Sequence, residues 1–384
     1  MMSEPLLSLC GMTRHGRVPQ VGIMARPRVV NGIFQGKQGP LLLRYLEAAE
    51  REHAFACVFD PTAIQAQRKR LFGYVLAKRN EAGEREVELA DLVIPSVIYD
   101  QIISRRYDCS KAFIEARDYL KQFAVIFNGG YFDKWEVHTW LSVSSHIRPY
   151  LPHTARVTGV DSLRAFLQTH ETVFIKPIHG SLGLGIIRLQ RVGDGWNAIL
   201  RTRQGIGRAI EGRNARVLYQ HFKTRLLRNP HIVQEGIELA QFDGRPFDIR
   251  LLMQKNREGQ WKRTKLYLRV AAEGDFTSNL TTGGQALPLS ALEEDPRLSL
   301  QALKRSIRQV ETLIPTCIEE QSNRTLGEMG IDLGVSEMGD LYVIEVNSKP
   351  WKTPMTISGS EQLVDLSFLR PIRFALGLTS ARQR

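Results

Sequence analysis

The stretch from Ile331 to Asn347 places the strongest constraint on what this chain can fold into. Two apolar runs rich in Ile, Leu, Val and Tyr flank a Met-Gly pair, which is the composition of two antiparallel strands joined by a tight turn. Successive side chains of a strand point to opposite faces, so Glu345 and Asn347 project together. If the loop has an even number of residues, Asp332 lies opposite Glu345, and three oxygen-bearing side chains converge.

The carboxylates of Asp332 and Glu345 would repel each other in this arrangement. Two unit charges about 4 Å apart interact by about 4 kcal/mol at an effective dielectric constant near 20, against a folding free energy of roughly 5–15 kcal/mol. Protonation of one acid would relieve the repulsion, but a hard cation fits better because Asn347 adds a neutral oxygen. The hairpin therefore predicts a divalent-metal site, and a surface hairpin with solvated acids is the alternative.

Length and composition are typical of a globular chain with two or three domains, since 43% of its 384 residues are apolar and 24% are charged. No run of about 18 apolar residues occurs, and the N-terminus lacks the apolar core of a signal peptide, so we expect a cytoplasmic protein without membrane insertion. The cysteines form no C-x-x-C pair, which argues against a zinc finger or a disulfide framework. They are Cys10, Cys57, Cys109 and Cys317.

The formal charge of +12 is compatible with nucleic acid, an acidic polymer, a phosphorylated ligand or solubility alone. Much of it lies between Arg201 and Arg228, where eight basic residues accompany one acid, Glu211. Aromatic residues are few in this segment and no nucleic-acid motif accompanies it, so nucleic-acid binding is disfavoured. A solvated helix face is the favoured interpretation, and a basic lid over bound phosphates is the more specific alternative.

Short apolar runs alternate with helical patterns in the first third of the chain, which predicts a small α/β domain with a parallel sheet. Its glycine-rich loop from Gln35 to Gly39 lacks the G-x-G-x-x-G spacing of a dinucleotide-binding loop. The expected units are a tail at 1–19, the α/β domain at 20–125, a unit with a phosphate loop at 126–236, a unit with the metal hairpin at 237–375 and a basic tail at 376–384.

A second glycine-rich loop follows a predicted strand that ends near Lys176. Gly180, Gly183 and Gly185 fall within six positions; glycine lets backbone N–H groups crowd around an anion, and Lys176 supplies a positive charge beside them. No Walker A sequence exists in the chain. Ser181 is a poor candidate nucleophile because a G-x-S-x-G elbow would need glycine at position 179. The loop is predicted to cradle phosphates.

Three further segments carry polar residues on predicted strands. Alternation places Asp248 and Arg250 on one strand face, where they could form a self-satisfied ion pair, and Arg269 lies in the next strand. Asn279 precedes another glycine turn. The strand around Gln234 ends where one unit passes into the next, and such an edge can offer backbone groups to a flat base.

In this order the motifs resemble the ATP-grasp superfamily, and within it the YheC/YheD type described as endospore coat-associated. The resemblance covers roughly residues 125 to 370. Asp332 and Glu345 are 345 − 332 = 13 residues apart, as in the D-alanine:D-alanine ligase branch. The matching pieces are Lys134 before a helix, K-P-x-x-G-S-x-G-x-G from Lys176 to Gly185, V-Q-E-G-I from Val233 to Ile237, R-P-F-D-I-R from Arg245 to Arg250, and the D…E-x-N set.

The resemblance implies an α/β and α+β chain, in which two α+β subdomains clamp a nucleotide and a pre-ATP-grasp-like α/β domain completes the substrate cleft. It implies ATP bound with Mg²⁺ or Mn²⁺. The metal ligands would be Asp332, Glu345 and Asn347, and the transferred phosphoryl group or the acceptor would meet Arg250, Arg269, Asn279 and Lys349. ATP would contact Lys134, Lys176, Gly180, Ser181, Gly183, Gly185, Gln234, Glu235, Gly236 and Ile237, with Glu238 or Gln241 at the ribose.

The function implied is an ADP-forming ligase that activates a carboxylate as an acylphosphate for attack by an amine or a thiol. Expected partners are ATP, a carboxylate and an amine of unknown identity, an acidic peptide or metabolite among the candidates, and spore-coat proteins. A nucleotide-binding coat protein without catalysis and a basic polyanion-binding protein remain alternatives. The location would be the cytoplasm or the spore coat.

Overall fold

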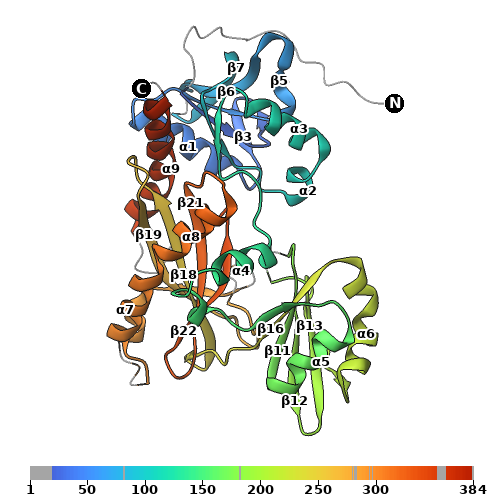
Figure 1. The fold of residues 1–384 in the computed structure, drawn as a ribbon. Coiled ribbons are helices and arrows are strands. Elements are labelled where there is room, and N and C mark those ends of the chain that lie inside the picture. The colour runs from blue at the N-terminus through green and yellow to red at the C-terminus, as the bar shows by residue number, and fades with distance from the viewer. Residues whose placement is uncertain are drawn as a thin grey trace.

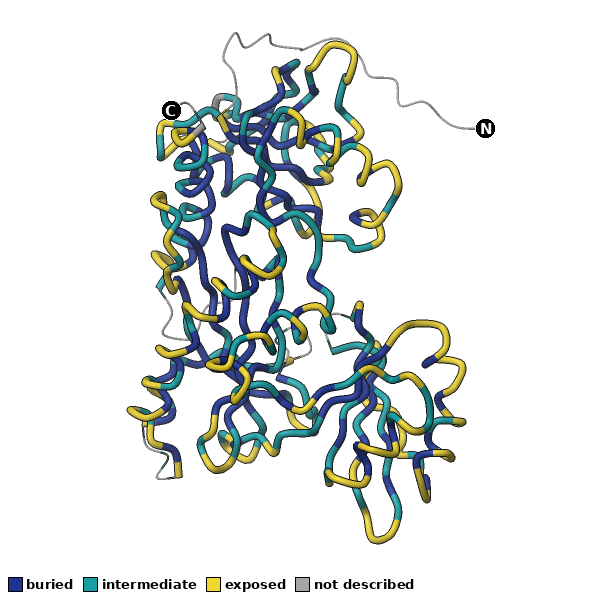
Figure 2. Tube along the Cα trace, viewed as in Figure 1, coloured by how far each residue is buried: buried dark blue, intermediate teal, exposed yellow. Residues whose placement is uncertain are grey.

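The computed structural model describes residues 20–80, 83–180, 183–278, 280, 283–293, 295, 297–352 and 360–382. Three large sheets with their helices follow one another in space, with the N-terminal sheet at the top of Figure 1 and the sheet of residues 154–235 at the lower right. Each has a buried interior and exposed turns (Figure 2).

The N-terminal sheet has a parallel centre. All four residues of β1 are buried, as expected for a parallel strand covered on both faces, and β1 pairs in parallel with β4 and β8, which in turn pairs with β9. The elements are β1 (Val21–Met24), β2 (Arg28–Val30), β3 (Ile33–Gln35), α1 (Gly39–Arg51), β4 (Ala56–Phe59), β5 (Ile64–Gln65), β6 (Arg70–Arg79), β7 (Arg85–Val93), β8 (Val97–Asp100), α2 (Arg105–Asp108), α3 (Lys111–Leu120) and β9 (Val125–Phe127).

The last helix of the chain, α9 (Glu361–Arg382), returns to this first domain. It lies beside α1 in Figure 1, and Phe368, Ile372 and Leu376 are buried in the N-terminal core. Residues 376–382 are therefore helix where a basic tail was expected, because the apolar residues of their helical face are needed to cover α1 and the sheet. No helix among the described residues is long and apolar enough to cross a bilayer.

The smallest unit is an antiparallel sheet covered by two helices. Its strands run in the order β10-β16-β11-β12-β13, and the buried face of α6 packs with α5 against them. The Asn214 side chain accepts the Val217 N–H and begins α6. The elements are β10 (Thr154–Arg156), α5 (Val160–Thr169), β11 (Thr172–Pro177), β12 (Ile187–Val192), β13 (Gly195–Thr202), β14 (Gly205–Ile206), β15 (Ile210–Gly212), α6 (Ala215–Arg228) and β16 (His231–Glu235).

The third unit is an antiparallel sheet in the order β20-β19-β18-β21-β22, with an apolar face under three helices. One of these, α4, precedes the small unit in the chain, yet Val137 and Leu141 belong to this larger core and α4 contacts α8. The expected boundary at residue 126 therefore lies too early. The elements are α4 (Lys134–Ser142), β17 (Gln241–Phe242), β18 (Arg245–Lys255), β19 (Trp261–Val270), β20 (Gln285–Leu287), α7 (Leu300–Val310), α8 (Leu313–Ser322), β21 (Glu328–Val335) and β22 (Leu341–Asn347).

The hairpin of β21 and β22 contains the predicted pairing of Asp332 with Glu345, but its loop differs from the expected one. Val335 pairs with Leu341, so the loop from Ser336 to Asp340 has five residues, an odd number. A register shift between Asp332 and Leu333 compensates for it, and Asp332 pairs with Glu345. The condition of an even loop was wrong, whereas the predicted pairing is present because one extra residue in the strand restores the alternation.

Candidate nucleotide and metal site

One row of charged residues crosses the larger sheet on the face opposite its apolar core. Arg250 of β18 pairs with Asp332 of β21, which pairs with Glu345 of β22. The neighbouring positions Ile249 and Leu333 are fully buried in the core. Because side chains alternate along each strand, a single face of the sheet carries the acids and the arginines together.

Two arginines contact Asp332. The Arg250 Nε lies 2.6 Å from Oδ1 of Asp332, and the Arg269 Nη2 lies 2.9 Å from Oδ2. Asp248 pairs with Arg269 and not with Arg250, since its carboxylate accepts a hydrogen bond from Arg269 Nε at 2.7 Å. Burial opposes ionisation of Asp332, but the charges of Arg250 and Arg269 outweigh it and lower its pKa below the ordinary value. Asp332 is therefore held as an anion.

The acids carry oxygens of the kind that a hard cation prefers, and cationic side chains of the protein lie against them in this structure. Oδ1 of Asp332 is buried and makes no aligned hydrogen bond to any described residue, although the Arg250 Nε lies beside it. The side-chain amide of Asn347 forms no hydrogen bond with the described residues either. The described part of the chain has no cluster of three His, Cys, Asp or Glu side chains, so a cation here would need Asn347 and oxygens of a bound ligand.

A cleft joins this face to the small unit. Apolar residues of α4, β16 and β22 form its walls, and its polar residues converge from both units. A flat apolar group would therefore have walls on two sides and charges at one end. The lining is Lys134, Val137, His138, Leu141, Leu151, Pro152, Lys176, Ile232, Gln234, Val343, Ile344, Glu345 and Val346.

Two lysines stand at the polar end of this cleft. Asp133 caps helix α4 and so fixes Lys134, whose Nζ donates to Glu345 at 2.6 Å and to the Gly180 carbonyl at 3.1 Å. Lys176 donates to the Gln234 side chain at 2.5 Å. Burial lowers the pKa of Lys176 to about 8; Glu345 raises it and Lys134 lowers it further. The structure thus brings both predicted lysines to the predicted acid.

The glycine-rich loop is described except for Ser181 and Leu182. Gly183 has φ of +70°, and a Cβ there would lie 2.8 Å from Nη1 of Arg201. Arg201 is buried and pairs with Asp275 at 2.6 Å. The sequence pattern marked Arg201 only as the first residue of the basic segment, and no motif linked it to the glycine-rich loop.

The other basic residues of the segment after Arg201 are exposed on turns and on α6, which agrees with the solvated helix face. One of them, Arg225, reaches the glycine-rich loop beside Gly185. These residues are Arg203, Arg208, Arg213, Arg216, Lys223, Arg225 and Arg228.

The predicted hinge connects the small unit to the larger one. Gly236 donates its N–H to Thr172 at 2.8 Å, and a Cβ at this glycine would collide with the Thr172 side chain. Glu235 pairs with His170 at 3.1 Å. The N–H of Ile237 has no hydrogen-bond acceptor among the described residues. Both ribose candidates, Glu238 and Gln241, are exposed.

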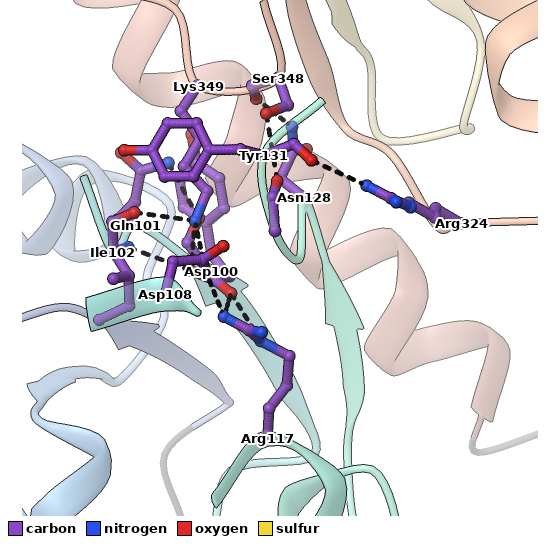
Figure 3. Close-up of polar contacts among 12 residues, drawn as sticks. Asp100, Gln101, Ile102, Asp108, Arg117, Asn128, Tyr131, Arg324, Ser348 and Lys349 are labelled. Atoms are coloured by element: carbon purple, nitrogen blue, oxygen red, sulfur yellow. Dashed lines mark hydrogen bonds and ion pairs between the residues drawn. The ribbon is translucent and has the colours of Figure 1, made fainter. Parts of the chain in front are cut away.

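Of the predicted catalytic residues, Asn279 lies outside the described residues, and Lys349 does not join this group. Lys349 turns away from the charged face, and its Nζ bonds to Asp100 at 2.6 Å and to the Ile102 carbonyl at 3.0 Å (Figure 3). With 2% of its side chain exposed, Lys349 is held by Asp100 in this structure, away from the two lysines at the polar end of the cleft.

The family model described as YheC/D like ATP-grasp matches residues 124–378. The endospore coat-associated proteins YheD and YheC of Bacillus subtilis are each 25% identical to this chain, over 285 and 276 residues. The matches cover 73% and 71% of this chain, and 62% of YheD and 75% of YheC, so the chain spans less than two thirds of the YheD length. A glutathione synthetase of Parasynechococcus marenigrum is 30% identical over 149 residues, which is 39% of each protein.

Solved structures share the architecture at low identity. D-cycloserine synthetase DcsG has a TM-score of 0.52 at 12% identity, and D-alanyl-alanine synthetase A of Vibrio cholerae has 0.51 at 10% identity. Each match covers 94% of this chain and 99% of the other. Together with the family match, they confirm the fold that the ordered motifs predicted.

Proposed function

This chain belongs to the YheC/D-like ATP-grasp family, and on that basis we propose that it is an ATP- and Mg²⁺-dependent ligase that activates a carboxylate as an acylphosphate. One observation carries the proposal: the strand register that lines up Arg250, Asp332 and Glu345 across three neighbouring strands. Asp332 and Glu345, with Asn347, would hold the metal, because two carboxylates and an amide oxygen are ligands that Mg²⁺ accepts when phosphate oxygens complete its shell.

The nucleotide would lie in the cleft between the two subdomains. Its base would pack between apolar residues such as Leu141 and Val343, within reach of the free N–H of Ile237. Lys134 and Lys176 would contact the phosphates, and the backbone of the glycine-rich loop would cover them.

Charge balance favours joint binding of metal and nucleotide. Three carboxylates, Asp248, Asp332 and Glu345, are matched by four cationic side chains, Arg250, Arg269, Lys134 and Lys176, which leaves a net charge of +1 (4 − 3). A divalent ion alone would raise this excess, whereas a triphosphate brings several negative charges. We therefore infer that the metal enters with the nucleotide.

The residues supply positioning and electrostatic stabilisation. In the proposed reaction a carboxylate oxygen of the substrate attacks the γ-phosphorus, the bond to the β-phosphate oxygen breaks, and ADP leaves. An amine then attacks the acylphosphate and inorganic phosphate departs. Arg250 and Arg269 are held by their acids before substrate arrives, so they need little reorganisation to stabilise the charge on the transferred group. The bound metal would add charge neutralisation at the phosphates.

The test is ADP release from Mg·ATP in the presence of pooled carboxylates and amines. We expect release that depends on both pools in the natural protein, and none from Glu345→Gln, which keeps the size of the side chain. A nucleotide-binding coat-associated protein without catalysis is the second candidate, motivated by the names of the two relatives. Magnesium-dependent ATP binding with no ADP from any pool would favour it.

A further inference from the structure

Lys349 belongs to a buried group of charges between the N-terminal domain and the end of the metal hairpin. Its Nζ lies 2.6 Å from Asp100 and 3.8 Å from Asp108. Arg117 contacts the same two acids, at 3.0 Å and 2.5 Å. Asp100 ends strand β8, so a residue that follows β22 in the chain is tied to the carboxyl edge of the first sheet (Figure 3).

This group is neutral and deeply buried, although Lys349 also borders a small pocket with Gln101 and Trp351. Two acids, Asp100 and Asp108, are matched by two cations, Arg117 and Lys349, and the side chains of Asp100 and Lys349 are 0% and 2% exposed. None of the polar atoms left without a hydrogen-bond partner in the described structure belongs to these four residues. No charge is left over to bind substrate, so the group acts on the protein itself.

A second contact fixes the residue between Lys349 and the proposed metal ligand Asn347. The Asn128 Nδ2 donates to the Ser348 carbonyl at 2.7 Å and to the Glu328 carbonyl at 2.8 Å. Asn128 directly follows β9, the neighbour of β8. Two adjacent strands of the N-terminal sheet therefore fix consecutive residues after Asn347.

The side chain of Asn347 makes no hydrogen bond of its own to the described residues, so its position depends on its backbone. We propose that Lys349 is a positioning residue, which anchors the end of β22 on Asp100 and thereby sets Asn347 in place to bind the metal with the nucleotide. This inference rests on the proposed function. Replacing a residue that orients a metal ligand commonly lowers metal affinity by about 10–100-fold.

The test compares ATP affinity with excess Mg²⁺ and with EDTA, by calorimetry on the full chain. The ratio of the two affinities measures how much Mg²⁺ strengthens ATP binding. A variant that only destabilised the fold would not change this ratio. We expect Lys349→Met to lower the ratio about tenfold or more while ATP affinity in EDTA stays within about twofold. Lys255→Met is the matched control, since this buried lysine also pairs with an acid, Glu319, at 2.5 Å, and it should keep the ratio.

A double variant separates anchoring from stability. Lys349→Met leaves Asp100 buried with one partner fewer, whereas Asp100→Asn with Lys349→Met removes both charges, so the double variant should regain thermal stability yet keep the low ratio. The inference is overturned if Lys349→Met keeps the natural ratio, if the double variant restores it, or if Lys255→Met loses as much. If the ATP affinity of the natural protein is the same with Mg²⁺ and with EDTA, the proposed metal site itself is wrong.

Discussion

Lys134 and Glu345 form an ion pair of 2.6 Å that joins the first turn of α4 to the last strand of the larger sheet. In the free protein this lysine occupies an oxygen of a proposed metal ligand, and a nucleotide would compete for its ammonium group. A metal at Glu345 and a phosphate at Lys134 would each break this pair, so binding of one favours binding of the other.

Replacing Lys134 with Met should change these two affinities in opposite directions. ATP binding should weaken by roughly 10–100-fold, because charge-assisted hydrogen bonds contribute about 1.5–3 kcal/mol. Binding of Mn²⁺ without nucleotide should strengthen, because Glu345 loses its competing cation. Paramagnetic relaxation of water protons measures the second effect. Weaker Mn²⁺ binding in this variant would contradict the competition.

Protonation of Lys176 should control ATP affinity in mildly alkaline solution. Its pKa is lowered to about 8, chiefly by burial, so the ammonium loses its proton as pH rises through 8 and the phosphates lose a positive partner. ATP affinity should fall between pH 7 and 9, and binding near pH 8 should take up a proton. Calorimetry in buffers of different ionisation enthalpy measures this uptake. Lys176→Arg should show neither effect.

Asp332 should contribute to stability in a defined range of pH. Arg250 and Arg269 lower its folded pKa against the effect of burial, so its contribution is present above the unfolded value of about 3.9 and is lost as pH falls through the folded value. Asp332→Asn should reduce the unfolding free energy at neutral pH and flatten its acid dependence. Denaturant unfolding from pH 2.5 to 7 measures both. An unchanged acid slope would show that Asp332 is not the titrating group.

Gly183→Ala should strain the backbone and should also reduce ATP affinity. An alanine with φ of +70° is strained by about 1–3 kcal/mol, and its Cβ would press on Arg201 Nη1 at 2.8 Å. Gly193→Ala is the matched control, because Gly193 also has a positive φ, +56°, but its Cβ would meet nothing within 4 Å. Both variants should lose stability, and only Gly183→Ala should weaken ATP binding. Equal ATP affinities would contradict a role for the loop.

Local patterns predicted the elements of the site well. Alternation in β18 and β22 identified the faces that carry Arg250 and Glu345, because a strand fixes side-chain direction without outside help. The pairing of Asp332 with Glu345 was predicted correctly, but from a loop with an even number of residues, which was wrong. The register shift that restores the pairing leaves no mark in the sequence pattern.

Long-range partners could not be predicted in the same way. Lys349 follows the metal motif and was expected at the transferred phosphoryl group or the acceptor, and its pairing with Asp100, which is 249 residues away in the chain, could not be predicted. Helix α4 was assigned to the small unit by its place in the sequence, whereas its apolar face packs on α8. In both cases the deciding contact lies in a distant segment, which no local periodicity encodes.

The return of α9 to the first domain has a consequence for biosynthesis. Tyr45 packs against Phe368, and Phe127 against Phe374, with ring centroids 5.0 Å and 5.3 Å apart. During translation the N-terminal domain emerges first, and domains generally fold in that order. Here the ribosome must release residues 361–382 before the domain that contains Tyr45 and Phe127 can bury these rings, so that domain is completed only after the two units that follow it in the chain.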